Sequence, residues 1–237
     1  MCENSVNSHP FTPQAMQFAG LVSLAMSALA LCHLPVAAMG GHFDADDAVM
    51  LAPGRCQVEI WAIATRSRSS TEHLGPACRV GPVELGLSLD RARENGATAH
   101  LVGAQLKWAV DSVLPQVSLG LVASVGRDLR QSSGVSGSLF APITWFANDQ
   151  LQVHFNLGLD RDGSGGTFRR KGLAGEWAAS DRVTLIGELL RSGGQRSARV
   201  GVRIGLAEFT SLDFSTLHSS ASSARRLAVG LNHEFGR

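Results

Sequence analysis

The chain has 237 residues, of which 44% are hydrophobic and 17% are charged, so its composition is that of a folded protein and not of a disordered one. The formal net charge is only +1, which argues against a nucleic-acid-binding protein, because such proteins present a basic face. The sequence is rich in glycine, with 26 residues, and contains no tyrosine.

The first 38 residues predict a secretory signal peptide. Residues 18–38 carry no charge and end in small residues, and Val36 and Ala38 occupy the positions that precede a signal-peptidase cut, so we expect cleavage after Ala38. The alternative is a single transmembrane anchor. Pro35 and the early end of the apolar run argue against it, because a helical span needs about 20 apolar residues. Residues 39–54 follow as an acidic lead-in, which we expect on the periplasmic side.

Apolar residues alternate with polar or small residues from Arg55 onward, as in strands whose two faces meet different surroundings. In residues 151–161 the odd positions are apolar and the even positions are polar or small, and residues 198–206 repeat the pattern. Twelve strands are expected, at residues 55–66, 72–80, 82–91, 98–110, 116–128, 135–147, 151–161, 168–179, 183–191, 196–206, 210–217 and 224–235. Most of them exceed the usual strand length of about 5–6 residues and match the roughly 9–11 residues of a tilted strand that crosses a membrane.

The connections between these strands alternate as well. Connections rich in Ser, Gly and polar residues, such as residues 162–167, are followed by mostly shorter ones, such as residues 148–150. Polar loops at one end and short turns at the other are typical of outer-membrane barrels, in which both chain termini lie at the short-turn end. Since a sheet in lipid must close to pair every backbone group, residues 55–237 are predicted to form an all-β, closed, antiparallel up-and-down transmembrane β-barrel of about 12 strands.

In these features the sequence resembles the Gram-negative outer-membrane β-barrel proteins over residues 55–235, and Phe235 looks like the aromatic residue that often ends the last strand of such barrels. The resemblance implies an outer-membrane location, contact with outer-membrane lipid, handling by periplasmic chaperones and the barrel-assembly machinery, and a monomeric state. It implies passage of small solutes or a structural role at the surface. Two alternatives stay open: a membrane-embedded hydrolase of the outer-membrane phospholipase type, and a secreted soluble β-barrel or sandwich that binds an apolar ligand.

Several charged residues fall on the face of the strands opposite the apolar one, and we expect them to line the lumen. The candidates are Glu59, Glu84, Lys107, Glu176, Glu188, Arg199 and Arg203. Arg199 and Arg203 share one strand face, and Glu176 and Glu188 lie on the two preceding strands. Such charges either fill the barrel with salt bridges or line a polar path through it.

Two cysteines, Cys56 and Cys78, follow the predicted signal peptide. If the first two strands form a hairpin with its tip at residue 67, these cysteines face each other across it, in an oxidising compartment. We therefore predict a Cys56–Cys78 disulfide, with two free thiols as the alternative.

No segment of the sequence predicts a catalytic, cofactor or metal site. Residues 42–47 bring three carboxylates close together but lack the spacing and the glycine of a calcium loop. Residues 160–166 are rich in glycine, but no helix follows them, as a nucleotide-binding loop would require. No arrangement of Ser and His suggests a nucleophile with its base.

Overall fold

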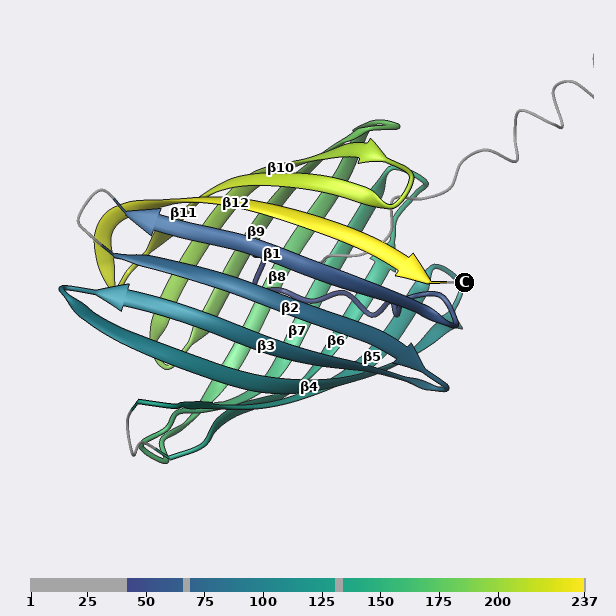
Figure 1. Cartoon of the computed structure of the whole chain (residues 1–237). Helices are drawn as coiled ribbons and strands as arrows, with labels where there is room; N and C mark the ends of the chain where they lie inside the picture. The colour runs from purple at the N-terminus through teal and green to yellow at the C-terminus, as the bar shows by residue number, and fades with distance from the viewer. Residues whose placement is uncertain (1–41, 66–68, 131–133, 237) are drawn as a thin grey trace, which may run out of the picture. The chain divides into compact units, whose positions relative to one another are not determined.

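The computed structural model describes residues 42–65, 69–130 and 134–236, and these form a twelve-stranded antiparallel barrel (Figure 1). The strands are β1 (Arg55–Thr65), β2 (Ser70–Val80), β3 (Val83–Glu94), β4 (Ala97–Leu114), β5 (Val117–Asp128), β6 (Ser136–Phe146), β7 (Leu151–Arg161), β8 (Thr167–Ser180), β9 (Val183–Ser192), β10 (Gln195–Ala207), β11 (Thr210–Ser219) and β12 (Ser222–Gly236). Each strand pairs with its neighbours in sequence, and β1 pairs with β12, so the predicted fold class is confirmed. The predicted signal peptide lies outside the described residues. Within them, no helix is long and apolar enough to cross a membrane.

The first and last strands close the barrel over their whole common length. Their antiparallel register runs from Arg55 opposite Gly236 to Thr65 opposite Arg226, so no strand edge is left unpaired between them. Since β1 begins where β12 ends, both termini of the barrel lie at one end, which we call the termini end. The opposite end, where β1 ends and β12 begins, is the far end.

Five of the six connections at the far end are shorter than the sequence predicts, and the sixth, between Asp128 of β5 and Ser136 of β6, is one residue longer. The β3–β4 and β9–β10 connections are two-residue turns, Asn95–Gly96 and Gly193–Gly194, and all four of these residues have positive φ angles, from 49° to 87°. Two central residues with positive φ suit the tight hairpin turn whose twist matches that of the flanking strands. The strands therefore continue to the turn, and residues expected to lie in polar loops take part in strand pairing.

The outer face of the barrel is apolar. Its side chains include Leu87 and Val200, each 61% exposed, and Leu227, 67% exposed. Trp108, Trp145 and Trp177 also point outward, as expected, with 40%, 45% and 49% of their surface exposed. A soluble barrel would bury its apolar face and expose its polar one, so this arrangement contradicts the soluble alternative.

The Cys56–Cys78 disulfide is present and joins β1 to β2. The two residues are direct cross-strand partners in the hairpin register, as the spacing predicted. Both lie on the outward-facing positions of their strands, because Glu59 on β1 and His73 on β2, each an odd number of residues away, face the lumen cavity. The bridge therefore fastens the termini end of the first hairpin without occupying the lumen.

Candidate functional site: a lumen segment and the space beside it

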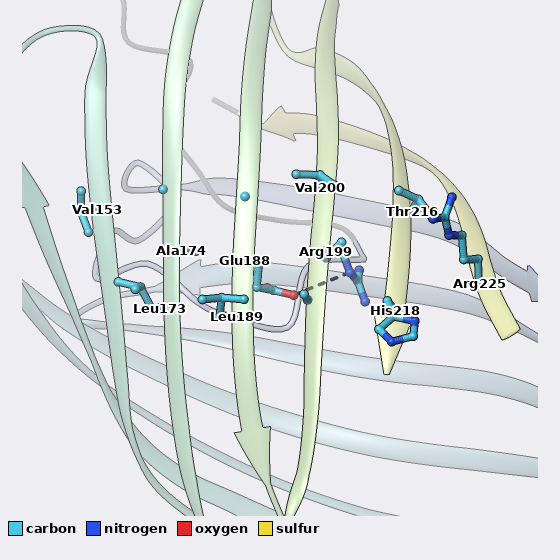
Figure 2. Close-up of a pocket in the computed structure, with 13 residues that line it drawn as sticks. Val153, Leu173, Ala174, Glu188, Leu189, Arg199, Val200, Thr216, His218 and Arg225 are labelled. Atoms are coloured by element: carbon cyan, nitrogen blue, oxygen red, sulfur yellow. Dashed lines mark ion pairs between the residues drawn. The ribbon is translucent and has the colours of Figure 1, made fainter. Parts of the chain in front are cut away.

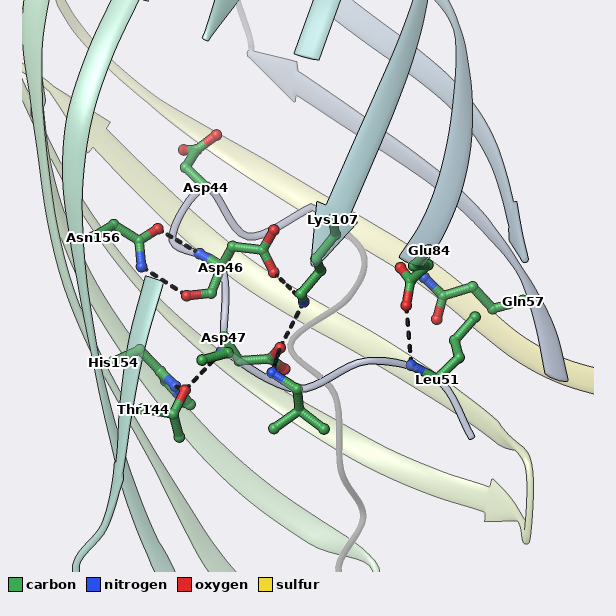
Figure 3. A network of polar contacts seen from close by, with 12 residues as sticks. Asp44, Asp46, Asp47, Leu51, Gln57, Glu84, Lys107, Thr144, His154 and Asn156 are labelled. Atoms are coloured by element: carbon green, nitrogen blue, oxygen red, sulfur yellow. Dashed lines mark hydrogen bonds and ion pairs between the residues drawn. The ribbon is translucent and has the colours of Figure 1, made fainter. Parts of the chain in front are cut away.

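Residues 42–51 lie inside the barrel, and we call them the lumen segment. The sequence predicts a periplasmic lead-in here. The structure instead places backbone and side-chain groups of residues 42–51 in hydrogen bonds with inward-facing residues of nine strands, β2–β4 and β6–β11. Figure 3 shows the contacts with Glu84, Lys107, Thr144 and Asn156. Alternation along each strand produces these inward positions, because successive side chains point to opposite faces of the sheet.

The first contact region holds residues 44 and 45 against β9 and β10. The backbone N–H groups of Asp44 and Ala45 donate to the Glu188 carboxylate at 2.7 and 2.6 Å. Arg199 donates to the Asp44 carboxylate at 3.0 Å and forms an ion pair with Glu188 at 3.6 Å. Arg170 on β8 also donates to the Asp44 carbonyl oxygen. One buried acid and two arginines thus fix two consecutive residues of the lumen segment.

The second contact region centres on Lys107 of β4, which is 5% exposed. Its ammonium group donates to Asp46 at 2.8 Å and to Asp47 at 2.7 Å, so it lies between two consecutive carboxylates (Figure 3). Asn156 of β7 accepts from the Asp46 backbone N–H and donates to the Asp46 carbonyl oxygen, each at 2.7 Å. A buried charge is stable only when it is paired and its remaining hydrogen-bonding groups are satisfied, and this cluster meets that condition at Lys107.

The third contact region lies toward the termini end. The Ala48 N–H donates to the Thr144 hydroxyl at 2.8 Å, and the Leu51 N–H donates to the Glu84 carboxylate at 3.0 Å. Arg79 donates to the Leu51 carbonyl oxygen at 2.8 Å. The segment is therefore fastened by its backbone as well as by its acids.

The other end of the lumen segment reaches the opposite wall. The His42 imidazole Nε2 lies 2.6 Å from the Ser215 hydroxyl of β11. Phe43 packs against the small apolar cluster of Ala45, Ala174 and Ile186. The segment thus crosses the lumen from β3 to β11.

A separate ion pair joins β10 to β11 beside the segment. Arg203 and Asp213 are direct cross-strand partners, and the guanidinium donates to both carboxylate oxygens, at 2.8 and 2.9 Å. The two residues are 3% and 0% exposed. Asn232 of β12 donates to the same carboxylate at 2.9 Å, so three neighbouring strands share one buried acid.

A cavity of about 550 Å³ remains beside the lumen segment. Its lining extends from Gln57, near the termini end of β1, to Ser136, the first residue of β6 at the far end. Asp44 and Asp46 line it from the lumen segment, and the inward faces of β1–β6 supply most of its wall.

The seven charged residues expected in the lumen occupy two different places. Glu59, Glu84 and Lys107 line the cavity beside the lumen segment. The other four, Glu176, Glu188, Arg199 and Arg203, are 3–5% exposed and lie outside its lining. Glu176 lies 3.6 Å from the His154 imidazole, and the remaining three form the contacts given above.

Sequence reasoning missed the partners of these charges. Asp44, Asp46 and Asp47 were seen as an acidic cluster, but their contacts with strand residues 60 or more positions away were not predicted. The one available signal was the combination of an acidic stretch with a lysine and arginines on inward strand positions. Across the part of the chain that the structure describes, no group of three His, Cys, Asp or Glu residues could hold a metal ion.

Asp162 lies in the β7–β8 loop at the far end, in the glycine-rich stretch considered above. Its carboxylate accepts from the Ser164 hydroxyl and from the backbone N–H groups of Ser164 and Gly166. These hydrogen bonds, the Ser164 hydroxyl first, hold the pKa of Asp162 below its ordinary value. The acid shapes the loop and shows no feature of a nucleotide site.

Solved structures with a similar fold are outer-membrane porins and channels. The KdgM porin has a TM-score of 0.65 at 11% identity, with 76% of this chain and 99% of that chain covered. The COG4313 outer membrane channel from Pseudomonas putida F1 has a TM-score of 0.61 at 12% identity, covering 82% and 100%. The NanC porin has a TM-score of 0.58 at 10% identity, covering 75% and 98%.

These similarities establish a shared barrel fold. A search of curated proteins finds no match. A family model described as "Uncharacterised conserved protein UCP029691" matches residues 27–235, which include the lumen segment and nearly the whole barrel, and the chain therefore belongs to that family.

Proposed function

We propose that the protein is an outer-membrane channel that passes small polar solutes through the space beside its lumen segment. The observation that carries this proposal is the 550 Å³ cavity, whose lining runs from Gln57 near one end of the barrel to Ser136 at the other. A barrel of twelve strands lies between the side-chain-filled barrels of about 8 strands and the open porins of about 16, so a partly filled lumen is the expected geometry.

The apolar outer face and the porin-like fold support the location of the channel in the outer membrane. In a bilayer, the exposed leucines and valines contact hydrocarbon, and the closed sheet leaves no unpaired backbone edge. As a barrel of this class, the protein would meet periplasmic chaperones and the barrel-assembly machinery during insertion. We propose that it acts as a monomer, since the proposed path lies within a single barrel.

The charges around the cavity favour uncharged or zwitterionic solutes. Lys107 is paired with Asp46, and the His73 imidazole lies 2.6 Å from the Asp90 carboxylate. Glu84 accepts the Leu51 N–H. The lining as a whole carries five carboxylates and four lysine or arginine side chains, so neither sign dominates the path, and selection between cations and anions is expected to be weak.

The hydrolase alternative finds little support in the site. The structure does bring a serine and a histidine together, Ser215 and His42, but both are buried in the lumen, away from lipid. The His42 Nδ1 atom has no hydrogen-bond partner among the described residues, so the third group that orients the base of a Ser–His pair is missing.

Reconstitution in planar bilayers tests the proposal. The protein should give stepwise conductance, and Gly86→Phe should lower it at least twofold. Gly86 lines the cavity, and a Cβ there meets only ordinary contacts, at 3.6 Å from Ala77 and 3.7 Å from Gln105, so the ring extends into the path without disrupting the wall. The matched control is Ala64→Phe, which adds the same ring to the outer face of β1.

A folded barrel that stays silent would overturn the channel and favour a structural surface protein. Full conductance in Gly86→Phe would show that solutes do not use this cavity. Heat-modifiable migration on gels, measured for each variant, verifies that the barrel has folded.

A further inference from the structure

A second hollow lies on the outside of the barrel, and residues of β7 to β12 line it (Figure 2). It has a volume of about 710 Å³, and most of its lining is apolar: Val153, Leu173, Leu189, Ala198 and Val200. Leu173, Leu189 and Val200 are 42%, 56% and 61% exposed, so they lie on the outer face. We call this hollow the outer groove.

Two glycines in register form the floor of the outer groove. Gly175 of β8 lies directly opposite Gly187 of β9, and the row continues to Val153 on one side and Val200 on the other. Cross-strand partners point to the same face, so the two missing side chains leave one continuous depression between the flanking residues.

Neither glycine is required by the packing of the barrel. A Cβ at Gly187 would meet no atom within 4 Å, and one at Gly175 would meet only the Gln152 carbonyl oxygen, at 3.9 Å. At the inward-facing Gly158, by contrast, a Cβ would lie 2.2 Å from the Leu139 carbonyl oxygen. Crowding thus accounts for glycine at position 158, whereas the glycines at 175 and 187 create open space on the surface.

The outer groove carries the positive charge of Arg225 and the imidazole of His218 at one end. Arg225 and His218 belong to its lining and are exposed, and both lie close to the β11–β12 turn at the far end. Neither side chain has an ion pair or hydrogen-bond partner within the described part of the chain. An apolar trough that ends in a guanidinium and an imidazole complements an acyl chain with an anionic head.

We propose that the outer groove binds an anionic, phosphate-bearing lipid of the leaflet at the far end, with one acyl chain over Gly175 and Gly187 and the phosphate at Arg225 and His218. The inference rests on the proposed membrane location and is independent of conduction through the lumen. Acyl chains in a bilayer touch every part of an outer face, but a groove with a cationic end selects one lipid position and one headgroup charge.

Native mass spectrometry of the detergent-solubilised protein, with phosphatidylglycerol or phosphatidylcholine added, tests this. The wild type should retain one phosphatidylglycerol and hold it in preference to phosphatidylcholine. Gly187→Leu fills the groove and should weaken retention at least tenfold, and Gly175→Leu should repeat the result. Arg225→Gln should abolish the preference for phosphatidylglycerol while leaving a weak site for either lipid.

Matched controls place the same changes elsewhere on the outer face. Ala123→Leu adds bulk on β5, and Arg169→Gln removes a charge from β8 outside the groove lining; both should retain lipid as the wild type does. Unchanged lipid retention in both glycine variants would overturn the proposal. A wild-type dimer that dissociates in the glycine variants would also overturn it, since a second copy of the chain would then occupy the groove. A protein that conducts in bilayers but retains no lipid would refute this inference and leave the proposed channel standing.

Discussion

The ammonium group of Lys107 lies 2.7 Å from a carboxylate oxygen of Asp47, although the two residues stand 60 positions apart in the chain. Lys107 belongs to the barrel wall, and Asp47 belongs to the segment that crosses the lumen. Their exposed fractions are 5% and 2%, so the contact is withdrawn from water. This pair is the central fastening of the lumen segment to the barrel.

Replacing Lys107 by methionine should release the lumen segment. The change leaves Asp46 and Asp47 without their cation, and breaking a buried pair by removing one partner costs about 3–5 kcal/mol. The segment is then expected to leave the lumen for part of the time, with conductance steps that are larger and noisier than those of the wild type. Lys171→Met is the matched control, because Lys171 lies on the outer face of β8. Equal conductance in the two variants would contradict the fastening role.

The same pair predicts unequal labelling of the two lysines of the chain. An amine-acylating reagent should modify the exposed Lys171 readily and Lys107 at least tenfold more slowly, because Lys107 is enclosed by two carboxylates. Peptide mass spectrometry after a time course measures both rates. Asp47→Asn should raise the rate at Lys107 and leave that at Lys171 unchanged. Equal rates in the wild type would mean that the lumen segment is not seated in solution.

Removal of the disulfide should lower stability without changing conduction. The bridge closes a chain separation of 22 residues, and the double variant Cys56→Ser, Cys78→Ser should lose about 2–4 kcal/mol of unfolding free energy, seen as a lower temperature for the heat-modifiable gel shift. Conductance should stay the same, because both cysteines face outward. Mass spectrometry under non-reducing conditions must show the wild type two protons lighter than its reduced form.

The Arg203–Asp213 pair predicts a compensating double variant. Arg203→Leu alone removes the cation from the buried Asp213 carboxylate and leaves it the neutral Asn232 amide as a donor, at 2.9 Å, so the change should destabilise the barrel by about 3–5 kcal/mol. Arg203→Leu combined with Asp213→Leu should be less destabilised than the single variant, because no unpaired charge remains. Denaturant unfolding of the wild type, both single variants and the double variant measures the coupling. Additive losses would show that the two side chains do not stabilise each other.

The β7–β8 loop should loosen at acid pH. The pKa of Asp162 is held below its ordinary value by the Ser164 hydroxyl and backbone N–H groups, so the ionised form stabilises the folded loop. This contribution is complete above the ordinary pKa and is lost as the pH falls through the lowered one. NMR titration of the Asp162 carboxyl group should show the lowered pKa, and Ser164→Ala should raise it toward the ordinary value. An identical titration in the two proteins would remove the assigned cause.

The strands could be predicted from the sequence because each one depends on the local alternation of apolar with polar or small residues. All twelve strands lie close to their predicted ranges, and the Cys56–Cys78 register follows from the position of one hairpin tip. Five of the six far-end connections were predicted too long, because the alternation weakens at polar strand ends, where both faces meet water. Turns such as Gly193–Gly194 allow pairing to continue to the strand ends.

The candidate site was predicted only in part. Burial of charged residues such as Lys107 and Arg199 could be predicted, because an odd or even position in the strand decides whether a side chain faces the lumen or the outside. The position does not indicate which residues the side chain contacts there. The partners lie in residues 44–47, a stretch without periodicity, and their positions depend on how that stretch crosses a finished barrel. The outer groove could not be predicted from the sequence either, because Gly175 and Gly187 become neighbours only through the β8–β9 register.

The sequence by itself determined a closed sheet with an apolar outside and a polar inside, since each of these follows from the side to which successive residues point and from the need to pair every backbone group. The tertiary structure alone decided what fills the inside. A short acidic segment has no preferred conformation of its own. It takes one here because closure of the twelve strands fixes where Lys107, Asn156 and Glu188 lie around the lumen, and these residues hold the segment in place. The remaining space, and with it the proposed path, is the part of the lumen that this segment does not occupy.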